Sequence, residues 1–254
     1  MELEYYHYII AILGSAVAGA INTLAGNGSA ITLTILTELM GLPGNMANGT
    51  NRVGVLSQTV ASTYAFHRKG KLDIKASKYY IILTVIGAVV GVYVATQISN
   101  EAFIQVFRYL MIVMLIIILV KPGRWLRETD TENPPSIWFI IPMFLALGFY
   151  GGFIQMGMGI FFLAIMVLGA RHSLIDSNVI KSLIVAIYTV LVLAIFHYKG
   201  LVDWKIGGIM AIGQMAGGYI MAIVAAKHPK ANIWTHRVLI VVVIAAILRL
   251  FNVY

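Results

Sequence analysis

The sequence predicts an all-α polytopic membrane protein with two pseudo-symmetric, inverted repeats, each made of a glycine-broken hairpin and three transmembrane helices. Three observations lead to this prediction: a very apolar composition, apolar stretches of membrane-spanning length, and a motif that occurs twice at a fixed distance. The first two indicate that lipid is the solvent, and the third divides the chain into halves.

The composition is too apolar for a protein surrounded by water. Hydrophobic residues make up 60% of the 254 residues and charged residues only 11%, and the mean hydropathy is +0.88. Soluble domains carry about 25% charged residues, and roughly a quarter of a soluble chain's surface stays exposed to water. Four segments supply the about 20 apolar residues that cross a bilayer core. They are 79–99, 102–120, 206–226 and 234–251.

The net charge of +8 could indicate a nucleic-acid partner, but its distribution favours a membrane. The basic residues lie in short segments between apolar stretches, which is the pattern of cytoplasmic loops in membrane proteins. We therefore expect a lipid bilayer as partner and no nucleic acid. The chain has no Cys and no zinc-protease, serine-hydrolase or P-loop motif, so no cofactor, metal or catalytic residue is predicted.

An internal repeat is visible in the loops. Residues 67–73 and 197–203 share His, Lys, Gly and Asp at matching positions, 130 residues apart. The same offset relates Asn48 to Asn178 and Gly87 to Gly217. Because self-similarity at a fixed period indicates repeated architecture, we predict a first transmembrane repeat, a cytoplasmic linker and a second transmembrane repeat. Their bounds are 1–121, 122–135 and 136–254.

Each repeat is predicted to contain five helical segments. They are 5–22, 29–41, 45–66, 75–98 and 101–121, and then 137–156, 159–169, 174–197, 206–226 and 234–252. The second segment of each repeat follows a glycine-rich break and is short, since 29–41 would span only roughly 20 Å. Glycine-interrupted segments at matching places in two halves indicate the binding site of a transporter.

The orientation of the repeats depends on segment 137–169. If it enters the membrane and returns to the same side, the repeats are inverted, both termini lie outside, and only Lys199 and Lys205 break the positive-inside rule. If it crosses once, these two lysines move inside and the basic group at 227–237 moves outside. The hairpin breaks the rule less and is preferred.

The two glycine-rich breaks are candidate ligand sites. Broken backbone within lipid must line a cavity or be covered by protein. At residues 22–29, either Asn27 or Ser29 suits the N-cap of the short helix, whose N–H groups favour an anion. The alternative is a tight hairpin without a ligand. The second break, 155–159, has Gln155 as its hydrogen-bonding side chain.

Arg52 and Lys181 are cations inside predicted helices at corresponding places of the two repeats. Arg52 is about two turns into segment 45–66, where a charge requires a partner. Its forked guanidinium matches two oxygens of an anionic ligand. Alternatively, Arg52 reaches the membrane interface or pairs with Glu38. Lys181 is the corresponding cation of the second repeat, and Asp176 is its candidate partner.

The predicted substrate-binding residues combine the breaks, the cations and the polar residues around them. They are Asn22, Gly26, Asn27, Gly28, Ser29, Asn48, Thr50, Asn51, Arg52, Gln155, Gly157, Gly159, Asn178 and Lys181. The repeated loop motif is interpreted as structural instead. Gly70 and Gly200 suit helix C-caps, and Asp73 and Asp203 suit N-caps.

Several of these segments resemble the TauE/SafE sulfite exporter family. The similar segments are 19–28, 41–43, 47–52, 69–73, 148–153 and 199–204. The resemblance covers nearly the whole chain and implies a bacterial inner-membrane permease with duplicated halves. It also implies sulfite, sulfonates or other sulfur-containing anions as substrates. Met156, Met158 and Lys181 depart from the family pattern.

The resulting functional prediction is a secondary transporter that binds a small anion near the middle of the bilayer and hydrolyses no ATP. An anion channel with the same site is one alternative. An intramembrane enzyme or receptor is another. A carrier and a channel differ in counterflow, and an enzyme would alter its substrate chemically.

Overall fold

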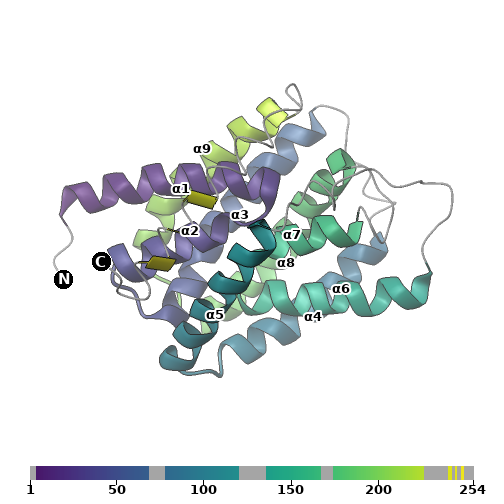
Figure 1. The fold of residues 1–254 in the computed structure, drawn as a ribbon, viewed down its shortest axis with the longest axis horizontal. Helices are drawn as coiled ribbons and strands as arrows, with labels where there is room; N and C mark the ends of the chain where they lie inside the picture. The colour runs from purple at the N-terminus through teal and green to yellow at the C-terminus, as the bar shows by residue number, and fades with distance from the viewer. Residues whose placement is uncertain are drawn as a thin grey trace.

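The computed structural model describes residues 4–68, 78–119, 136–166 and 174–225, with single residues of the last segment (240, 241, 244, 247 and 248). Within these residues the chain is helical with short connections (Figure 1). The elements are α1 (Tyr5–Ala25), α2 (Gly28–Thr34), the π-helix η1 (Ile35–Leu39), α3 (Gly44–His67), α4 (Lys78–Ala95), α5 (Asn100–Leu119), α6 (Ile137–Phe153), α7 (Met158–Ala164), α8 (Leu174–Tyr198) and α9 (Trp204–Ala225). The predicted linker and nearly all of segment 234–252 lie outside the described residues.

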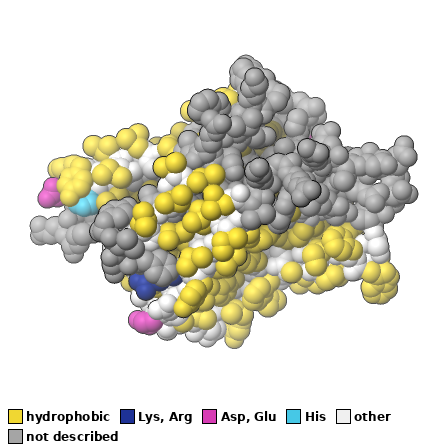
Figure 2. All heavy atoms as spheres, viewed as in Figure 1, with side chains coloured by type: hydrophobic (Ala, Val, Ile, Leu, Met, Phe, Trp, Pro, Cys, Tyr) yellow, Lys and Arg dark blue, Asp and Glu magenta, His cyan; other side chains and the backbone are white. Residues whose placement is uncertain are grey.

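Among the described residues, five helices are long and apolar enough to cross a membrane. They are Tyr5–Ala25, Lys78–Ala95, Asn100–Ile117, Asp176–Tyr198 and Trp204–Val224. Apolar side chains such as Leu13, Val90 and Ile116 point outward and are exposed. Figure 2 shows hydrophobic side chains over much of the described surface on one face, with the visible charged side chains toward one end. So large an exposed apolar surface suits lipid, which confirms the prediction of a helical multi-pass membrane protein.

The first break reverses the chain. Gly26, with φ of 72°, follows the last residue of α1, and α2 begins two residues later. A Cβ on Gly28 would lie 2.0 Å from the carbonyl oxygen of Ala18, and one on Gly14 would lie 2.6 Å from the Ile35 side chain. The segment α2–η1 therefore runs back along α1, as Figure 1 also shows. Helix α1 continues three residues beyond the predicted end at residue 22.

The second break also reverses the chain. Helix α6 ends at Phe153 rather than at the predicted residue 156. Gln155 and Gly157 then adopt positive φ values of 68° and 70°. The returning α7 packs on α6, since the rings of Tyr150 and Phe161 meet edge to face with centroids 5.4 Å apart. The helix ends early because these left-handed residues cannot continue it.

Glycines allow two helix pairs to pack closely. Helix α4 lies along α6, where a Cβ on Gly87 would be 2.1 Å from the Leu145 carbonyl oxygen. Helix α9 lies along α1, where a Cβ on Gly217 would be 1.9 Å from the Ala16 carbonyl oxygen. Small residues let helix backbones approach in this way within membranes. The pairs join the fourth helix of each predicted repeat to the first helix of the other.

Helix α3 is the polar centre of the bundle. It contacts α1, α2, α5, α8 and α9, and its Asn, Thr, Gln and Arg side chains are largely buried. It runs antiparallel to α8. Gly49 lies against Phe196 near the end of α8, whereas Thr59 shares a pocket with Lys181 near its beginning. A helix with so many polar groups is stable in a membrane because other helices, rather than lipid, surround it.

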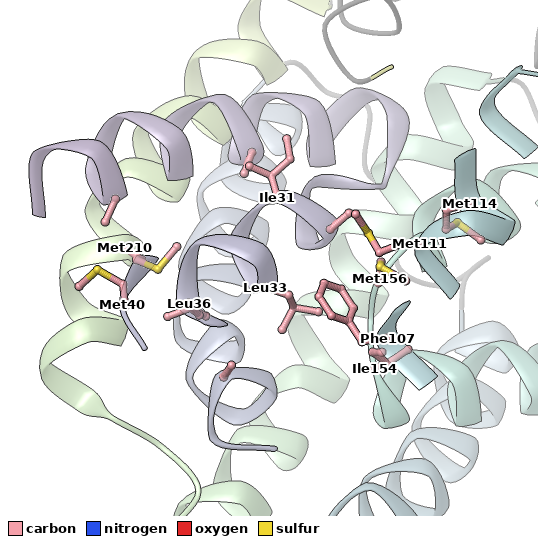
Figure 3. Close-up of a cluster of buried hydrophobic side chains, with 14 of the residues drawn as sticks. Ile31, Leu33, Leu36, Met40, Phe107, Met111, Met114, Ile154, Met156 and Met210 are labelled. Atoms are coloured by element: carbon pink, nitrogen blue, oxygen red, sulfur yellow. The ribbon is translucent and has the colours of Figure 1, made fainter. Parts of the chain in front are cut away.

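Met156 fills the core beside the second break. Figure 3 shows Met156 and Ile154 among Phe107, Met111 and Met114 of α5. All five side chains are fully buried. Met is flexible and fills irregular gaps, which suits the space beside a broken helix.

The structural interpretation of the repeated loop motif is confirmed for its second copy. Gly200 has φ of 69°, and the Leu201 N–H donates to the Phe196 carbonyl oxygen, which closes the end of α8. Asp203 caps α9, because its Oδ1 accepts a hydrogen bond of 2.9 Å from the Ile206 N–H. Gly70 and Asp73 of the first copy lie outside the described residues.

Candidate functional site

The two breaks meet inside the molecule. The Gly159 N–H at the start of α7 donates to the Gly26 carbonyl oxygen at the end of α1, over 3.1 Å. A Cβ on either glycine would lie 2.3 Å from the Cα of the other. The hairpins α1–α2 and α6–α7 approach this point from opposite ends of the molecule, as Figure 1 shows. The backbone contact requires glycine on both sides.

Arg52 is fully buried and bonded to the second break. Its Nη1 donates to the Gly151 carbonyl oxygen (2.7 Å) and to Gln155 Oε1 (2.8 Å). Its Nη2 donates to the Gly152 carbonyl oxygen (3.0 Å) and to Asn48 Oδ1 (3.2 Å). With an exposed fraction of 0%, Arg52 does not reach the membrane interface, so that alternative is wrong.

The acceptors of Arg52 explain how a charge is held here. Gly151 and Gly152 belong to the last turn of α6, where the helix dipole places partial negative charge. The Phe196 ring adds a cation–π contact, with its centroid 5.7 Å from the guanidinium carbon. All four hydrogen-bond acceptors within the described structure are neutral oxygens. The positive charge is stabilised but has no carboxylate among these acceptors.

Lys181 makes the matching contacts with the first break. Its Nζ donates to Asn178 Oδ1 (2.7 Å) and to the carbonyl oxygens of Thr23 (3.1 Å) and Asn22 (3.3 Å). Asn22 and Thr23 lie in the last turn of α1. Asp176, the candidate partner, lies on the exposed face of α8 and is not an acceptor of Lys181. Each cation therefore holds the end of the broken helix from the other half.

A small pocket lies where the breaks meet. It is lined by Asn22, Gln58, Thr59, Gln155, Met158, Gly159, Lys181, Ser182 and Val185. Its volume of about 10 Å³ is roughly what one water molecule needs. The lining combines one cation with amide and hydroxyl groups. Four predicted site residues, namely Asn22, Gln155, Gly159 and Lys181, come together here.

The sequence prediction missed Gln58 and Thr59 of α3 and Ser182 of α8, which line the pocket. Gln58 Oε1 accepts from Asn22 Nδ2 (2.7 Å), and Gln58 Nε2 donates to Thr23 Oγ1 (2.8 Å). Thr59 and Ser182 are also buried. A usable signal was present, since Gln58 and Thr59 interrupt an otherwise apolar or small stretch of α3 within membrane depth.

Two polar side chains of the first break, those of Asn27 and Ser29, lack hydrogen-bond partners among the described residues. Both polar atoms of the Asn27 amide and the Ser29 hydroxyl are buried without a hydrogen bond to the described residues. Asn27 occupies the N-cap position of α2 but makes no capping bond, so the predicted capping is wrong in this detail. The Asn51 oxygen accepts from Thr32 (2.6 Å), while its Nδ2 has no such partner.

The remaining predicted residues have structural contacts. Asn48 Nδ2 donates to the Phe153 carbonyl oxygen (2.7 Å), which adds to the hold on α6. Thr50 Oγ1 accepts from the Asp203 N–H (2.9 Å) and fastens α3 to the α8–α9 turn. Across the described residues, no group of three or more His, Asp or Glu is placed to hold a metal ion.

Membrane-spanning helices that surround a polar centre built from broken helices characterise membrane transporters. The family comparison agrees with this class. The chain belongs to the TauE/SafE family, since the family model described as "Sulfite exporter TauE/SafE" matches residues 11–250.

Relatives with curated names are bacterial proteins. The chain is 25% identical over 219 residues to a "Probable membrane transporter protein ORF9" of Sinorhizobium sp, covering 86% of this chain and 83% of the relative. It is 27% identical over 212 residues to a "Probable membrane transporter protein" of Haemophilus influenzae, covering 81% and 80%. No solved structure matches the chain significantly. The protein is therefore a membrane transporter of the TauE/SafE family.

Proposed function

We propose that the protein carries small sulfur-containing anions, such as sulfite or organosulfonates, across the membrane. The observation that carries this proposal is the pocket between the breaks, which Lys181 lines together with neutral hydrogen-bonding groups. A buried cation without a carboxylate among its hydrogen-bond acceptors favours an anion that arrives from solution. The family description supports sulfur chemistry for that anion.

The chemistry of the pocket suits a singly charged oxyanion. A sulfonate group has three oxygens around one negative charge. The pocket offers the Lys181 ammonium, the amides of Asn22, Gln58 and Gln155, and nearby hydroxyls. Charge-assisted hydrogen bonds of this kind are about twice as strong as neutral ones.

The size of the pocket favours a carrier over an open channel. A volume of about 10 Å³ is too small for even sulfite, which has four heavy atoms. Binding therefore requires the hairpins to separate. In transporters with repeated halves, such movement of one part against another gives alternating access from the two sides.

We also propose that residues 1–121 and 136–254 are inverted repeats joined by a cytoplasmic linker, 122–135. The reciprocal contacts support this. Arg52 holds the end of α6 and Lys181 holds the end of α1, and α4 pairs with α6 as α9 pairs with α1. The antiparallel course of α3 and α8 is what inversion requires. The bacterial relatives support a location in the bacterial inner membrane.

The function is tested with purified protein in liposomes. Uptake and counterflow are measured for sulfite, thiosulfate, sulfoacetate, taurine and an arylsulfonate, with chloride and sulfate for comparison. We expect saturable uptake of at least one sulfur-containing anion and stimulation by the same anion on the opposite side. The recovered substrate should be chemically unchanged.

Lys181→Gln is the test variant and Lys199→Gln its control, because Lys199 is exposed at the end of α8. We expect at least tenfold weaker uptake in the first and little change in the second. Uptake without trans-stimulation would indicate a channel. If none of the sulfur-containing anions is transported, the proposed substrate class is wrong.

A further inference from the structure

We infer that the two buried cations have different tasks: Lys181 supplies the positive charge that the anion meets, and Arg52 is a positioning residue that acts through Gln155. This inference deepens the proposed function and rests on it. It assigns different roles to two residues that the pattern of the repeats makes equivalent.

The position of Lys181 fits direct contact with an anion. Lys181 lines the pocket, and the next residue, Ser182, does so as well. Two of the three ammonium hydrogen bonds go to main-chain carbonyl oxygens at 3.1 and 3.3 Å. These bonds are longer than the 2.7–2.9 Å that is typical of ammonium–carboxylate pairs. An anionic oxygen can therefore replace either carbonyl group with a gain in interaction strength.

The position of Arg52 fits a supporting role. It is absent from the lining of the pocket, and its two terminal nitrogens are each engaged with two acceptors. Its connection to the pocket is Gln155, whose Oε1 accepts from both Arg52 and the Tyr188 hydroxyl. An amide held by its oxygen in this way has its N–H₂ group left as a donor for a ligand.

The backbone at Gln155 supports the same assignment. Gln155 has φ of 68° and is the non-glycine residue with positive φ in the described chain. Side chains other than Asn and Asp seldom adopt this conformation, because it strains the backbone. A glycine would satisfy the turn without strain, so the side chain itself has a use. Arg52 and Tyr188 hold that side chain toward the pocket.

The charge assignment is tested with a thiol probe. The chain has no Cys, so Ser182→Cys introduces a single thiol into the pocket lining. Its reaction rates are measured in liposomes with two methanethiosulfonates of similar size, the anionic sulfonatoethyl and the cationic aminoethyl reagent. The thiolate attacks the reagent's sulfenyl sulfur and releases methanesulfinate. The ratio of the two rates reports the local charge and cancels changes in access.

We expect Lys181→Gln to lower the anionic-to-cationic rate ratio about tenfold, as the loss of a nearby unit charge predicts. Arg52→Gln and Arg52→Lys should change the ratio about twofold at most. A tenfold change with Arg52→Gln, or none with Lys181→Gln, would reverse the assignment. A thiol that reacts with neither reagent would overturn it as well, because the pocket would then be closed to ions.

The positioning role is tested with sulfite uptake by Arg52→Gln, Gln155→Ala and the double variant. If Arg52 acts through Gln155, each single change raises KM for sulfite about tenfold, and the double variant is no worse than either single one. Arg52→Lys, which keeps a donor, should recover part of the affinity. Effects that multiply in the double variant would show that Arg52 acts independently of Gln155.

The two tests separate this inference from the proposed function. The thiol measurement needs no transported substrate. If no sulfur-containing anion is transported, the proposed substrate class fails, and the rate ratio still decides which cation faces the pocket.

Discussion

The two breaks are built alike but are satisfied differently. At the α6–α7 break, Arg52 and Asn48 hold the carbonyl oxygens of residues 151–153, and the Tyr150 hydroxyl donates to the Met156 carbonyl oxygen. At the α1–α2 break, Lys181 holds two carbonyl oxygens, whereas Asn27 and Ser29 are buried without partners among the described residues.

This difference suggests a test of the proposed hairpin movement. A buried polar group without a hydrogen bond costs about 1–3 kcal/mol, and native proteins have few of them. Those of Asn27 and Ser29 are tolerated if another state, or a ligand, supplies partners. We therefore expect the α6–α7 break to be the fixed side of the proposed site and the α1–α2 break to be its adjustable side.

The largest expected effect comes from the contact between the breaks. Gly26→Val or Gly159→Val would force a side chain into the opposing backbone, which lies 2.3 Å from where the Cβ of either new residue would be. We expect a loss of about 3 kcal/mol or more in the free energy of unfolding, from overpacking and, at Gly26, from its positive φ. Thermal unfolding in detergent measures the loss.

Gly208→Val is the control, because nothing lies within 4 Å of the Cβ that it would carry. It should unfold close to the wild-type temperature. If Gly26→Val and Gly208→Val were equally stable, the two breaks would not touch.

The second effect compares the two cations. Arg52→Met removes the donor of four hydrogen bonds, and Lys181→Met removes the donor of three. Gln155 Oε1 keeps the Tyr188 hydroxyl as a donor and the Asn22 carbonyl oxygen keeps the Gly26 N–H, so fewer oxygens are orphaned than bonds are lost. Each orphaned oxygen costs about 1 kcal/mol, partly offset because no charge remains to be desolvated. We expect Arg52→Met to lower the melting temperature by about 6 °C and Lys181→Met by about 3 °C. The reverse order would mean that the first break is the more firmly held.

A smaller effect is expected at the first break, where one substitution should change transport but not the free energy of unfolding. Asn27→Ala removes polar atoms that have no partners among the described residues, so the free energy of unfolding should stay within about 0.5 kcal/mol of wild type or rise slightly. Uptake should nevertheless fall, because the adjustable side loses a ligand or gating contact. Paired melting and uptake measurements decide this. A stability loss of about 2 kcal/mol would reveal a partner that Asn27 needs in the folded state.

The smallest effect concerns the repeated loop. Asp203→Ala removes the N-cap of α9 and should cost about 1 kcal/mol, measured as a shift in melting temperature. Asp73→Ala should cost the same if the halves are structurally equivalent. If the two variants shift the melting temperature by clearly different amounts, the two halves are not equivalent in their loops.

The sequence predicted the helices well because their signal is long and redundant. Every described helix lies where an apolar or broken segment was expected, with ends displaced by a few residues. The displacements at the breaks have a local cause. The predicted end of α1 at residue 22 is too early because the Asn22 side chain is bonded to Gln58. The helix instead continues to Ala25, just before the glycine that adopts positive φ.

The sequence predicted which types of group form the candidate site, but not which of them are hydrogen-bonded to one another. Glycine-rich breaks and lone cations are visible in a sequence, whereas the partner of a cation is not. Lys181 is 158 residues from its acceptor Thr23, and Arg52 is 99 residues from Gly151. The prediction assigned an anion to both cations because their actual acceptors are main-chain carbonyl groups. Every residue has such a group, so neither composition nor spacing shows which ones accept a hydrogen bond.

The exchange of contacts between the halves bears on how the protein is assembled. When the ribosome has delivered only α1 to α5, Arg52 already lies in the nascent chain, but its acceptors at residues 151, 152 and 155 do not yet exist in the membrane. The Thr23 carbonyl oxygen at the end of α1 likewise has no Lys181 donor until the second half is synthesised. We therefore expect Arg52 to need water or another polar partner until the second half has been inserted.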